Sequence, residues 1–412
     1  MKVAVMGFGT VGSGVVEIID SKSDLLASRC YKDELEVKYI LEVRDFSSTP
    51  YASRIVSDID TIVNDDEIGI VVETMGGVHP AFEFVMKCLN AGKSVVTSNK
   101  ALVADKAPEL FEAARKNNAA FMFEAAVGGG IPIIRTMFSS LSSNEITEFA
   151  GILNGTTNFI LTKMIKDNMS FKQALALAQE KGYAEKDPTA DIEGLDAGRK
   201  TCILASIAFG THVMPEEIHT QGITNITLED VAYVEDFGGK IKLLGRAKKQ
   251  EDGKVYAIVS PAVVKNSSML AGVDGVFNAL LVRGDAVGEV LLYGPGAGKM
   301  ATASAVVADV LDCARLGGFE GLYCWGANDS QKISDYKKGE VSLYVRGFSN
   351  NKENAVEKIR ESFQGVTVLS RENAPENEIA FVTGKEKEEE LFETLTCIKD
   401  FAAATVIRVT DY

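Results

Sequence analysis

Residues 6–15, MGFGTVGSGV, carry glycines at positions 7, 9 and 12 directly after a short apolar run. That run, Lys2 to Met6, predicts a buried strand, and the apolar residues around 15–19 predict a helix. A strand, this glycine spacing and a helix form the fingerprint of a dinucleotide-binding turn. Gly7 permits the tight turn, Gly9 lets a pyrophosphate approach the backbone, and Gly12 lets helix and strand pack closely. A purely structural turn is the alternative, and the flanking pattern favours cofactor binding.

The alternation of strands and helices continues to about residue 124. Further strands are predicted at 37–43, 68–74, 94–97 and 120–124, with helices near 80–91 and 107–116. This order indicates an α/β fold with a doubly wound parallel sheet of the Rossmann type. Ligands bind such sheets at the carboxyl ends of the strands. The residues expected there are Gly9, Thr74, Gly76, Ser98 and Lys100.

Arg44 and Asp45 follow the second predicted strand, where the adenosine ribose of a dinucleotide is read. An acid at this position favours the 2′-hydroxyl of NAD, and an arginine accommodates the 2′-phosphate of NADP. Because Arg44 comes first after the strand, the sequence favours NADP, with NAD as the alternative. A solvated charge pair would also explain the two residues.

Composition excludes several classes of protein. The chain has 412 residues, of which 46% are hydrophobic and 25% charged, as in packed globular proteins of two or three domains. Its net charge of -15 argues against a general nucleic-acid binder. We expect no membrane span and no signal peptide. The six cysteines lack CxxC spacing, which is typical of a reducing cytoplasm, and the three histidines lack zinc-site spacing.

Residues 149–200 carry the densest set of chemically useful side chains. A strand at 149–153 leads into Asn154-Gly155-Thr156-Thr157-Asn158, which predicts a helix cap or a site for a small carboxylate. An acidic run follows, and Asp196 and Lys200 are four residues apart, so on a helix they share a face. A solvated loop is the alternative, but the run leads into an apolar helix at 201–209. The acids of the run are Glu185, Asp187, Asp191, Glu193 and Asp196.

These parts match the needs of a carbonyl reduction by a nicotinamide. The forming alkoxide needs a proton or a cation, and a lysine can supply either. Lys200 beside Asp196, and Lys100 at a strand end, are the candidates. Glu185 or Asp196 would hold a substrate ammonium, and the segment containing Thr156 would hold a carboxylate. The predicted substrate is a small amino acid bearing an alcohol or an aldehyde.

At this point the sequence resembles the homoserine dehydrogenase family, over roughly residues 1–330. The run from Ala178 to Lys200 is similar to the family signature, with Gly-Tyr-Ala, Asp-Pro, Asp-Ile-x-Gly-x-Asp and a final lysine. The other similar motifs are the N-terminal GxGxVG, Thr97 to Lys100, Glu124 to Pro132, and Asn154 to Asn158. The resemblance implies NAD(P)-dependent interconversion of L-homoserine and L-aspartate 4-semialdehyde, on the route from aspartate to threonine and methionine.

The resemblance also implies roles for particular residues. Lys200 would be the acid/base residue, with Lys100 close to the reacting centre. Glu185 and Asp196 would bind homoserine, and we add Asp191 and Thr156 as candidates. The cofactor would contact Phe8, Thr10, Val11, Thr74, Ser98, Lys100, Gly182 and Gly298. A sodium or potassium ion would be coordinated by Glu124, Val127, Gly129 and Ile131, mostly through main-chain oxygens. The residues of this last segment, taken alone, favour a plain connector into a helix at Pro132.

The segment after residue 336 has a different pattern. Its strands and helices are predicted in the order βαββαβ, a ferredoxin-like unit that resembles the ACT domain of many homoserine dehydrogenases. The turn Gly347 to Asn351 lacks the Asp-x-Pro-Gly that effector-binding ACT domains carry. Feedback by threonine through such a site is therefore not expected, and a pairing or structural role is an equal alternative.

We predict three domains: a dinucleotide-binding domain at 1–130, completed by part of 295–330, an α+β substrate and dimerisation domain at 131–335, and the ACT-like domain at 336–412. The resemblance implies a monofunctional, cytoplasmic homodimer or homotetramer. A phosphate loop carries Ser or Thr directly after its lysine. The segment Gly294 to Thr302 does not fit this motif, because Met300 follows Lys299. A semialdehyde dehydrogenase that acts through a thioester would need an activated cysteine with a base. No cysteine lies at a predicted strand end or glycine turn of the right kind. The alternative of another class is a nucleotide or amino-acid sensor without turnover.

Overall fold

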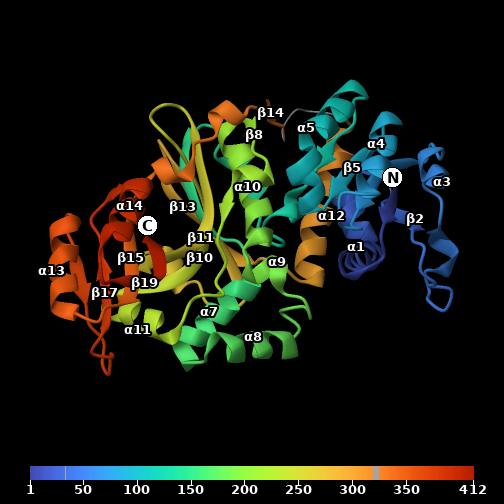
Figure 1. The fold of residues 1–412 in the computed structure, drawn as a ribbon. Coiled ribbons are helices and arrows are strands. Elements are labelled where there is room, and N and C mark those ends of the chain that lie inside the picture. The colour runs from blue at the N-terminus through green and yellow to red at the C-terminus, as the bar shows by residue number, and fades with distance from the viewer. Residues whose placement is uncertain (33, 319–323) are drawn as a thin grey trace. The chain divides into compact units, whose positions relative to one another are not determined.

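A computed structural model describes residues 1–32, 34–318 and 324–412 of the chain, which falls into two compact units (Figure 1). The first unit comprises Met1–Glu145, Cys202–Pro215 and Gly294–Asp329. The second comprises Ile146–Thr201, Glu216–Tyr293 and Ser330–Tyr412.

The first unit contains the predicted parallel sheet. Its strand order is β3-β2-β1-β4-β5-β6. The strands are β1 (Lys2–Met6), β2 (Glu36–Leu41), β3 (Ile55–Val56), β4 (Ile68–Glu73), β5 (Ser94–Thr97) and β6 (Phe121–Met122). Val3 to Met6 are fully buried, as expected of a strand covered on both faces. The strand order reverses between β1 and β4, and ligands of such sheets bind outside the carboxyl ends of the strands at this point.

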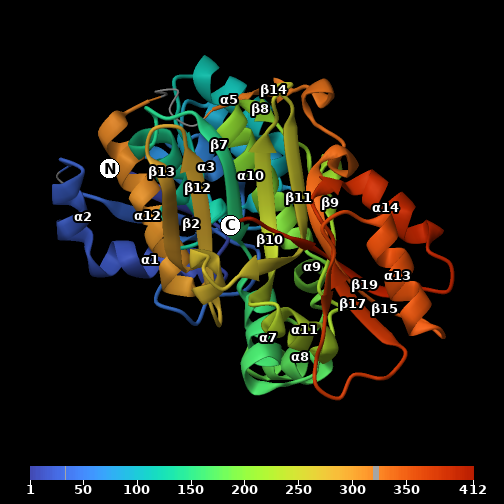
Figure 2. The same cartoon turned by 90° about the vertical axis from the view of Figure 1, so that its left-hand side faces the viewer.

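Helices cover the parallel sheet. They are α1 (Thr10–Ser21), α2 (Ser23–Arg29), α3 (Ile59–Val63), α4 (Ala81–Asn90), α5 (Lys100–Lys116) and α12 (Lys299–Leu316). α12 comes late in the chain yet packs on α1, β4 and β5, and Figure 2 shows it beside α1. Two short strands of this unit, β8 (Thr211–His212) and β14 (Gly326–Asn328), pair with each other.

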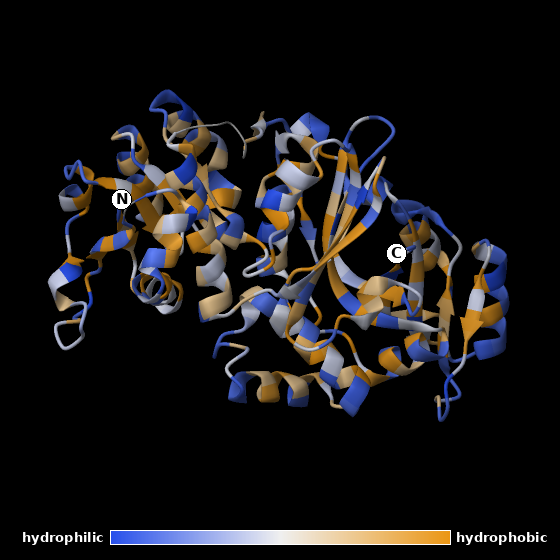
Figure 3. Cartoon of the chain, turned by 180° about the vertical axis from the view of Figure 1, so that it is seen from behind, coloured by the Kyte–Doolittle hydropathy of each residue, from blue (hydrophilic) through white to orange (hydrophobic). Residues whose placement is uncertain are grey.

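The second unit is built on a mixed sheet with the order β13-β12-β7-β10-β11-β19-β15-β17-β16. Its first five strands in space are β13 (Gly288–Pro295), β12 (Phe277–Gly284), β7 (Ile146–Ile152), β10 (Gly239–Lys249) and β11 (Val255–Lys265), and β9 (His219–Thr220) also pairs with β11. The helices are α7 (Gly155–Asp167), α8 (Phe171–Glu180), α9 (Thr189–Ile192), α11 (Leu228–Asp236) and the beginning of α10 (Leu195–Phe209), whose residues from Cys202 onward belong to the first unit. Figure 3 shows hydrophobic residues concentrated along the strands.

The C-terminal segment has the predicted βαββαβ order. Its elements are β15 (Glu340–Phe348), α13 (Lys352–Ser362), β16 (Thr367–Leu369), β17 (Glu378–Val382), α14 (Glu388–Cys397) and β19 (Ala402–Val409), with the two-residue β18 (Glu386–Lys387). The spatial order β16-β17-β15-β19, antiparallel throughout, is that of a ferredoxin-like sheet. β19 also pairs in parallel with β11 at Ala262 and Val263, so the sheet continues into the rest of the second unit. A separate ACT-like domain stays a prediction.

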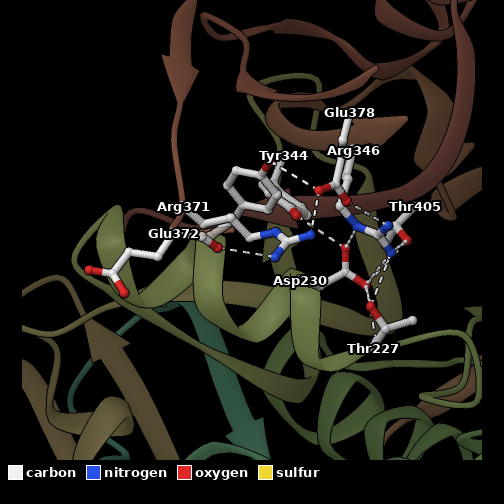
Figure 4. Close-up of polar contacts among 9 residues, drawn as sticks. Thr227, Asp230, Tyr344, Arg346, Arg371, Glu372, Glu378 and Thr405 are labelled. Atoms are coloured by element: carbon white, nitrogen blue, oxygen red, sulfur yellow. Dashed lines mark hydrogen bonds and ion pairs between the residues drawn. The ribbon is translucent and has the colours of Figure 1, made fainter. Parts of the chain in front are cut away.

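A buried polar cluster joins this segment to α11 (Figure 4). Asp230 of α11 accepts hydrogen bonds from Arg346 Nε at 2.6 Å and from the Tyr344 hydroxyl at 3.1 Å. Arg346 also donates to Glu378 of β17 at 3.2 Å, and Glu378 in turn accepts from Arg371. The carboxylates of Asp230 and Glu378 are almost completely buried.

Some sequence predictions of helices need correction. The turn after Gly130 does not lead into a regular helix, because α6 spans only Ile133–Arg135 and passes into a π-helical turn at Thr136–Ser140. The helix predicted near 107 begins earlier, at Lys100, because the Asn99 side chain caps it by accepting from Leu102 N at 3.2 Å. Among the described residues, none of the helices combines the length and apolar character that a membrane crossing requires.

Candidate active site

The glycine turn of the first unit has the geometry of a pyrophosphate cradle. Gly7 has a φ of +90°, which side chains disfavour. A Cβ on Gly12 would overlap the carbonyl oxygen of Gly7, so the close packing there requires glycine. A Cβ on Gly9 would meet nothing within 4 Å. Gly9 is the N-cap of α1 and, as a glycine, offers no side chain to bind the first N–H groups of the helix, which suits an anion at this end.

Glu42, which follows β2, is a residue that the sequence predictions missed. Its carboxylate accepts hydrogen bonds from the backbone N–H groups of Phe8 at 3.0 Å and Val43 at 2.9 Å. It also binds Arg44 through two side-chain contacts, at 3.1 and 2.6 Å. Arg44 and these backbone donors lower the Glu42 pKa to about 2. The predicted strand extended to residue 43 and therefore included Glu42. In the structure β2 ends at Leu41, and Glu42 is the acid that directly follows it.

Arg44 is held by this contact yet keeps a side chain that is 61% exposed. Its guanidinium also lies 5.4 Å from the centre of the Phe46 ring. Phe8, in the glycine turn, packs edge-on against Phe46 with 5.1 Å between ring centres. The structure thus brings the glycine turn, Glu42 and Arg44 together at the end of β2.

The carboxyl ends of β4 and β5 place the other predicted cofactor residues. Thr74 donates from its hydroxyl to the carbonyl oxygens of Met6 and Gly7, both at 3.0 Å, which ties β4 to the glycine turn. The buried Glu73 accepts from Thr97 at 2.5 Å, and burial raises the Glu73 pKa. Ser98 follows β5, and Lys100 begins α5. Both are partly exposed.

Gly298 also lies in the first unit, at the start of α12, with a φ of +122°. The first turns of α12 pack on α1, where a Cβ on Gly14 would lie 3.0 Å from the Ala303 Cβ. Lys299 forms an ion pair with Glu17 of α1 at 2.7 Å. Gly298 is therefore close to the helix that the glycine turn begins.

The second unit holds a buried lysine–carboxylate cluster. α10 begins at Leu195, so Asp196 and Lys200 share a helical face, and Lys200 Nζ lies 2.9 Å from Asp196. Lys200 Nζ also donates to the carbonyl oxygen of Leu153 at 2.8 Å. Asn154 donates from its side chain to Asp191 at 2.7 Å and to Asp196 at 3.0 Å. Lys200 and Asp196 are only 8% and 6% exposed, and burial raises the Asp191 pKa.

The remaining predicted substrate residues, and Gly182, which was predicted to contact the cofactor, lie beside this cluster or on the surface. Thr156, in the first turn of α7, donates to the Tyr183 carbonyl oxygen at 2.6 Å. Gly182 has a φ of +72° in the exposed turn after α8. Glu185 is exposed, as are Asp187 and Glu193, whereas Asp191 is partly buried and Asp196 is buried. The exposed acids lie in turns around the short α9, where little of the fold covers them.

The four predicted cation ligands lie in one tight, buried loop of the first unit. Glu124 accepts from the backbone N–H groups of Ile134 at 2.8 Å and Arg135 at 2.7 Å. Gly129 has a φ of +56° and lies against the backbone of Gly296. Ile131 offers a carbonyl oxygen that already accepts from Ile133 N. Within the described residues, no hydrogen bond reaches the carbonyl oxygens of Val127 and Gly129.

A dinucleotide-binding sheet together with a buried lysine–carboxylate pair defines the class of nicotinamide-dependent oxidoreductases. Comparisons with known proteins narrow this class. Residues 7–124 match the model of the homoserine dehydrogenase NAD-binding domain, and residues 132–311 match the model of homoserine dehydrogenase. The chain belongs to the homoserine dehydrogenase family.

Individual relatives agree with this assignment. A homoserine dehydrogenase of Pseudomonas aeruginosa is 44% identical over 320 residues, which cover 76% of this chain and 72% of the relative. The crystal structure of a homoserine dehydrogenase from Thiobacillus denitrificans has a TM-score of 0.88 and 36% identity, covering 100% of this chain and 98% of that one. A hyperthermophilic archaeal homoserine dehydrogenase in complex with NADPH has a TM-score of 0.66 and 32% identity, covering 78% of this chain and 99% of that one.

The chain is thus an NAD(P)-dependent oxidoreductase of amino-acid biosynthesis that interconverts L-homoserine and L-aspartate 4-semialdehyde. The alternative of a sensor without turnover has no support in these comparisons.

Proposed function

We propose that Lys200 is the acid/base residue of this reaction and that Lys100 is a second cation near the reacting oxygen. The support is the position of Lys200 Nζ, 2.8 Å from the Leu153 carbonyl oxygen and 2.9 Å from Asp196. An ammonium has three donors, so these contacts leave one for a substrate oxygen. When bound, the nicotinamide supplies or accepts the hydride. Lys200 donates its proton to the alkoxide oxygen in reduction and accepts the hydroxyl proton in oxidation.

We propose that the groups around Lys200 bind the amino-acid part of the substrate. Asp191 is partly buried and its pKa is raised by burial, so a substrate ammonium beside it would restore the charged form. Glu185 is an exposed carboxylate in the neighbouring turn and is a second ligand for the ammonium. Asp196 orients Lys200 as well as bordering the substrate. Thr156 and the N-terminal amides of α7 suit the substrate carboxylate.

We propose NADP as the preferred cofactor, with NAD as the alternative. Arg44 supports this preference because its exposed guanidinium is held in place by Glu42 and lies over Phe46. An arginine at the end of the second strand accommodates a 2′-phosphate. The archaeal relative in complex with NADPH is consistent with it. The residues proposed to contact the cofactor are Gly7, Phe8, Gly9, Thr10, Val11, Gly12, Arg44, Thr74, Ser98, Lys100, Gly182 and Gly298.

We propose a sodium or potassium ion in the loop of Glu124, Val127, Gly129 and Ile131. Hard cations take carboxylate and carbonyl oxygens, and this loop supplies both. Burial raises the pKa of Glu124 and raises that of the neighbouring Asp309 well above its usual range. A cation in the loop would stabilise both carboxylates in their charged forms and so offset the cost of burying their charges.

We propose a homodimer, or a homotetramer built from it. β13 lies at the edge of the mixed sheet. Exposed apolar side chains gather on and beside it, and the rings of Phe277 and Tyr293 stack with 5.2 Å between their centres. An exposed apolar strand edge is a favourable surface for pairing with a second copy. Val287, directly before β13, is also exposed.

We propose the domain division 1–130 with part of 295–330, 131–335 and 336–412, with a structural or pairing role for the ACT-like part. In the turn after β15, Ser349 is buried and its N–H donates to Asn377, while Asn351 caps α13. These contacts occupy the turn where an effector would bind. We also propose a cytoplasmic location, since the scattered spacing of the six cysteines, without a CxxC pair, is typical of a reducing compartment.

The test is homoserine-dependent reduction of NADP⁺ and of NAD⁺ by the full-length protein and two variants. Lys200→Met should lower kcat by about a hundredfold or more, with a smaller change in the homoserine KM. The control Lys166→Met removes an exposed lysine of α7 and should stay within about twofold of wild type. A Lys200→Met rate close to wild type in folded protein would contradict the role of Lys200. A higher kcat/KM with NAD⁺ than with NADP⁺ would contradict the cofactor preference.

A further inference from the structure

Asn154 lies at the turn from β7 to α7 and is only 5% exposed. Its side-chain oxygen accepts from the backbone N–H of Thr157 at 2.8 Å and so caps α7. Its amide nitrogen donates to Asp191 at 2.7 Å and to Asp196 at 3.0 Å. These partners fix the orientation of the amide, because the reverse orientation would set its oxygen against two carboxylates. The side chain therefore joins α7 to α9 and α10.

Capping alone does not explain an asparagine at this position. Serine and aspartate cap helices as well, since each has an oxygen that accepts from the first N–H groups. The chain itself caps α3 with Asp58 and α8 with Ser170. Neither of those side chains has the two N–H donors of an asparagine. What distinguishes Asn154 from an ordinary cap is the pair of donors that it directs at Asp191 and Asp196.

The same turn sets the position of Lys200. The carbonyl oxygen of Leu153 accepts from Lys200 Nζ at 2.8 Å. Asp196 Oδ2 accepts both from Asn154 and from Lys200, the latter at 2.9 Å. Lys200 thus rests on two acceptors, of which one precedes Asn154 in the chain and the other is hydrogen-bonded to it.

Asn154 also stabilises the charged form of Asp191. Burial raises the pKa of Asp191, the hydrogen bond from Asn154 lowers it, and the nearby Asp196 raises it again. When both carboxylates are ionised, two negative charges lie beside the single positive charge of Lys200. This surplus favours a ligand that brings a positive charge to Asp191, which is partly exposed.

We propose that Asn154 is a positioning residue, whose two amide donors hold Asp191 and Asp196 side by side so that Asp196 orients Lys200 and Asp191 receives the substrate ammonium. This role rests on the function proposed above for Lys200 and Asp191. A neutral donor offsets the repulsion between two carboxylates and adds no charge that would compete with the ammonium. Without the donors, the two carboxylates move apart or share a proton, and the ammonium loses a charged partner.

Asn154→Ser tests the donors apart from the cap, because serine keeps an oxygen for the N–H of Thr157. The midpoint of thermal unfolding and the NADPH affinity, from fluorescence titration, should stay near wild type. The kcat/KM for homoserine should fall by about tenfold or more, with the larger part of the loss in KM. Asn351→Ser, the same change at the cap of α13, is the matched control and should stay within about twofold of wild type.

Asn154→Asp adds a readout that a purely structural role would not change. Aspartate also caps the helix, but here it sets a third carboxylate beside Asp191 and Asp196, so the three groups hold a proton to higher pH than an isolated carboxyl. The protonated form regains one donor. The ratio of its kcat/KM to that of wild type should therefore rise as the pH is lowered from about 9 to about 6, whereas the ratio for Asn154→Ser should stay constant.

A homoserine kcat/KM of Asn154→Ser close to wild type would overturn the proposal. A ratio for Asn154→Asp that does not change with pH would also overturn it, as would a parallel loss of NADPH affinity and homoserine turnover in Asn154→Ser. Lys200→Met, assayed alongside, separates this outcome from a failure of the proposed function. An active Lys200→Met contradicts the role of Lys200, whereas an active Asn154→Ser beside an inactive Lys200→Met contradicts only the role of Asn154.

Discussion

The carboxylate of Glu42 accepts from three backbone N–H groups and from the Arg44 guanidinium, and these contacts lower its pKa from an ordinary 4.5 to about 2. A carboxyl group whose pKa is lower in the folded than in the unfolded state stabilises the fold above the unfolded pKa. That contribution is lost as the pH falls from 4.5 toward 2. Between about pH 6 and pH 3 the loss attributable to Glu42 is about 2 kcal/mol.

Glu42→Gln tests this linkage. The variant cannot titrate, so its free energy of unfolding should fall by about 2 kcal/mol less than that of wild type between about pH 6 and pH 3. Urea unfolding at the two pH values measures the difference. Glu112→Gln, at an exposed position of α5, is the control and should follow wild type. Equal pH dependence in wild type and Glu42→Gln would contradict the assigned contacts.

Single residues differ in how far the sequence could predict their roles. The pairing of Asp196 with Lys200 follows from their spacing once a helix is assumed, and the structure confirms it. The contacts of Lys200 with Leu153 and of Asn154 with Asp191 join segments about 40 residues apart, and no local pattern encodes them. Glu42 escaped prediction because a strand end cannot be located to within one residue from apolar periodicity.

The turn that joins β1 to α1 separates two roles of glycine. Gly12→Ala would press a Cβ into the carbonyl oxygen of Gly7, in backbone that cannot yield easily. We expect a loss of about 2 kcal/mol or more in stability together with weaker cofactor binding. Gly9→Ala would place its Cβ in open space. We expect near-normal stability but weaker cofactor binding, because the methyl group lies where the pyrophosphate approaches the backbone.

The two variants are measured by thermal unfolding and by fluorescence titration with NADPH. Stability and NADPH affinity should both fall in Gly12→Ala. In Gly9→Ala only the NADPH affinity should fall. Full NADPH affinity in Gly9→Ala would show that the cofactor does not approach the glycine turn.

Strands and helices of the first unit were largely predictable, because buried parallel strands are continuous apolar runs and glycine marks the first turn. The same reasoning gave the order of the C-terminal elements. It failed at the turn after Gly130, where Glu124 caps two backbone N–H groups and the chain forms only α6 and a π-helical turn. A side chain that satisfies backbone donors from ten residues away leaves no periodic signal.

The long-range connection between β11 and β19 makes the C-terminal segment part of the mixed sheet of the second unit. The buried cluster of Asp230, Arg346 and Glu378 adds a second connection, through α11 (Figure 4). Neither connection is visible in the sequence, because each joins residues more than a hundred positions apart.

Arg346→Met tests how much this cluster contributes to the free energy of unfolding. It leaves the buried carboxylate of Asp230 without its arginine, removes one of the two arginines bound by the buried carboxylate of Glu378, and should lower the free energy of unfolding by about 3–5 kcal/mol. The double variant Arg346→Met/Asp230→Leu removes one of those charges and should recover much of the loss. Urea unfolding and protease resistance of the C-terminal segment are the measurements. A single variant as stable as wild type would show that β19 alone attaches the segment.

The central claim is that Lys200 transfers the proton of the reaction, and chemical rescue tests it most directly. Lys200→Ala removes the ammonium and leaves room beside Asp196 and the Leu153 carbonyl oxygen. Turnover of this variant with homoserine is measured against the concentration of added ethylamine. The account predicts a low basal rate that rises with amine concentration and follows the protonation of the amine. A variant that binds homoserine and cofactor normally but shows no rescue, or one that retains the wild-type rate, would contradict it.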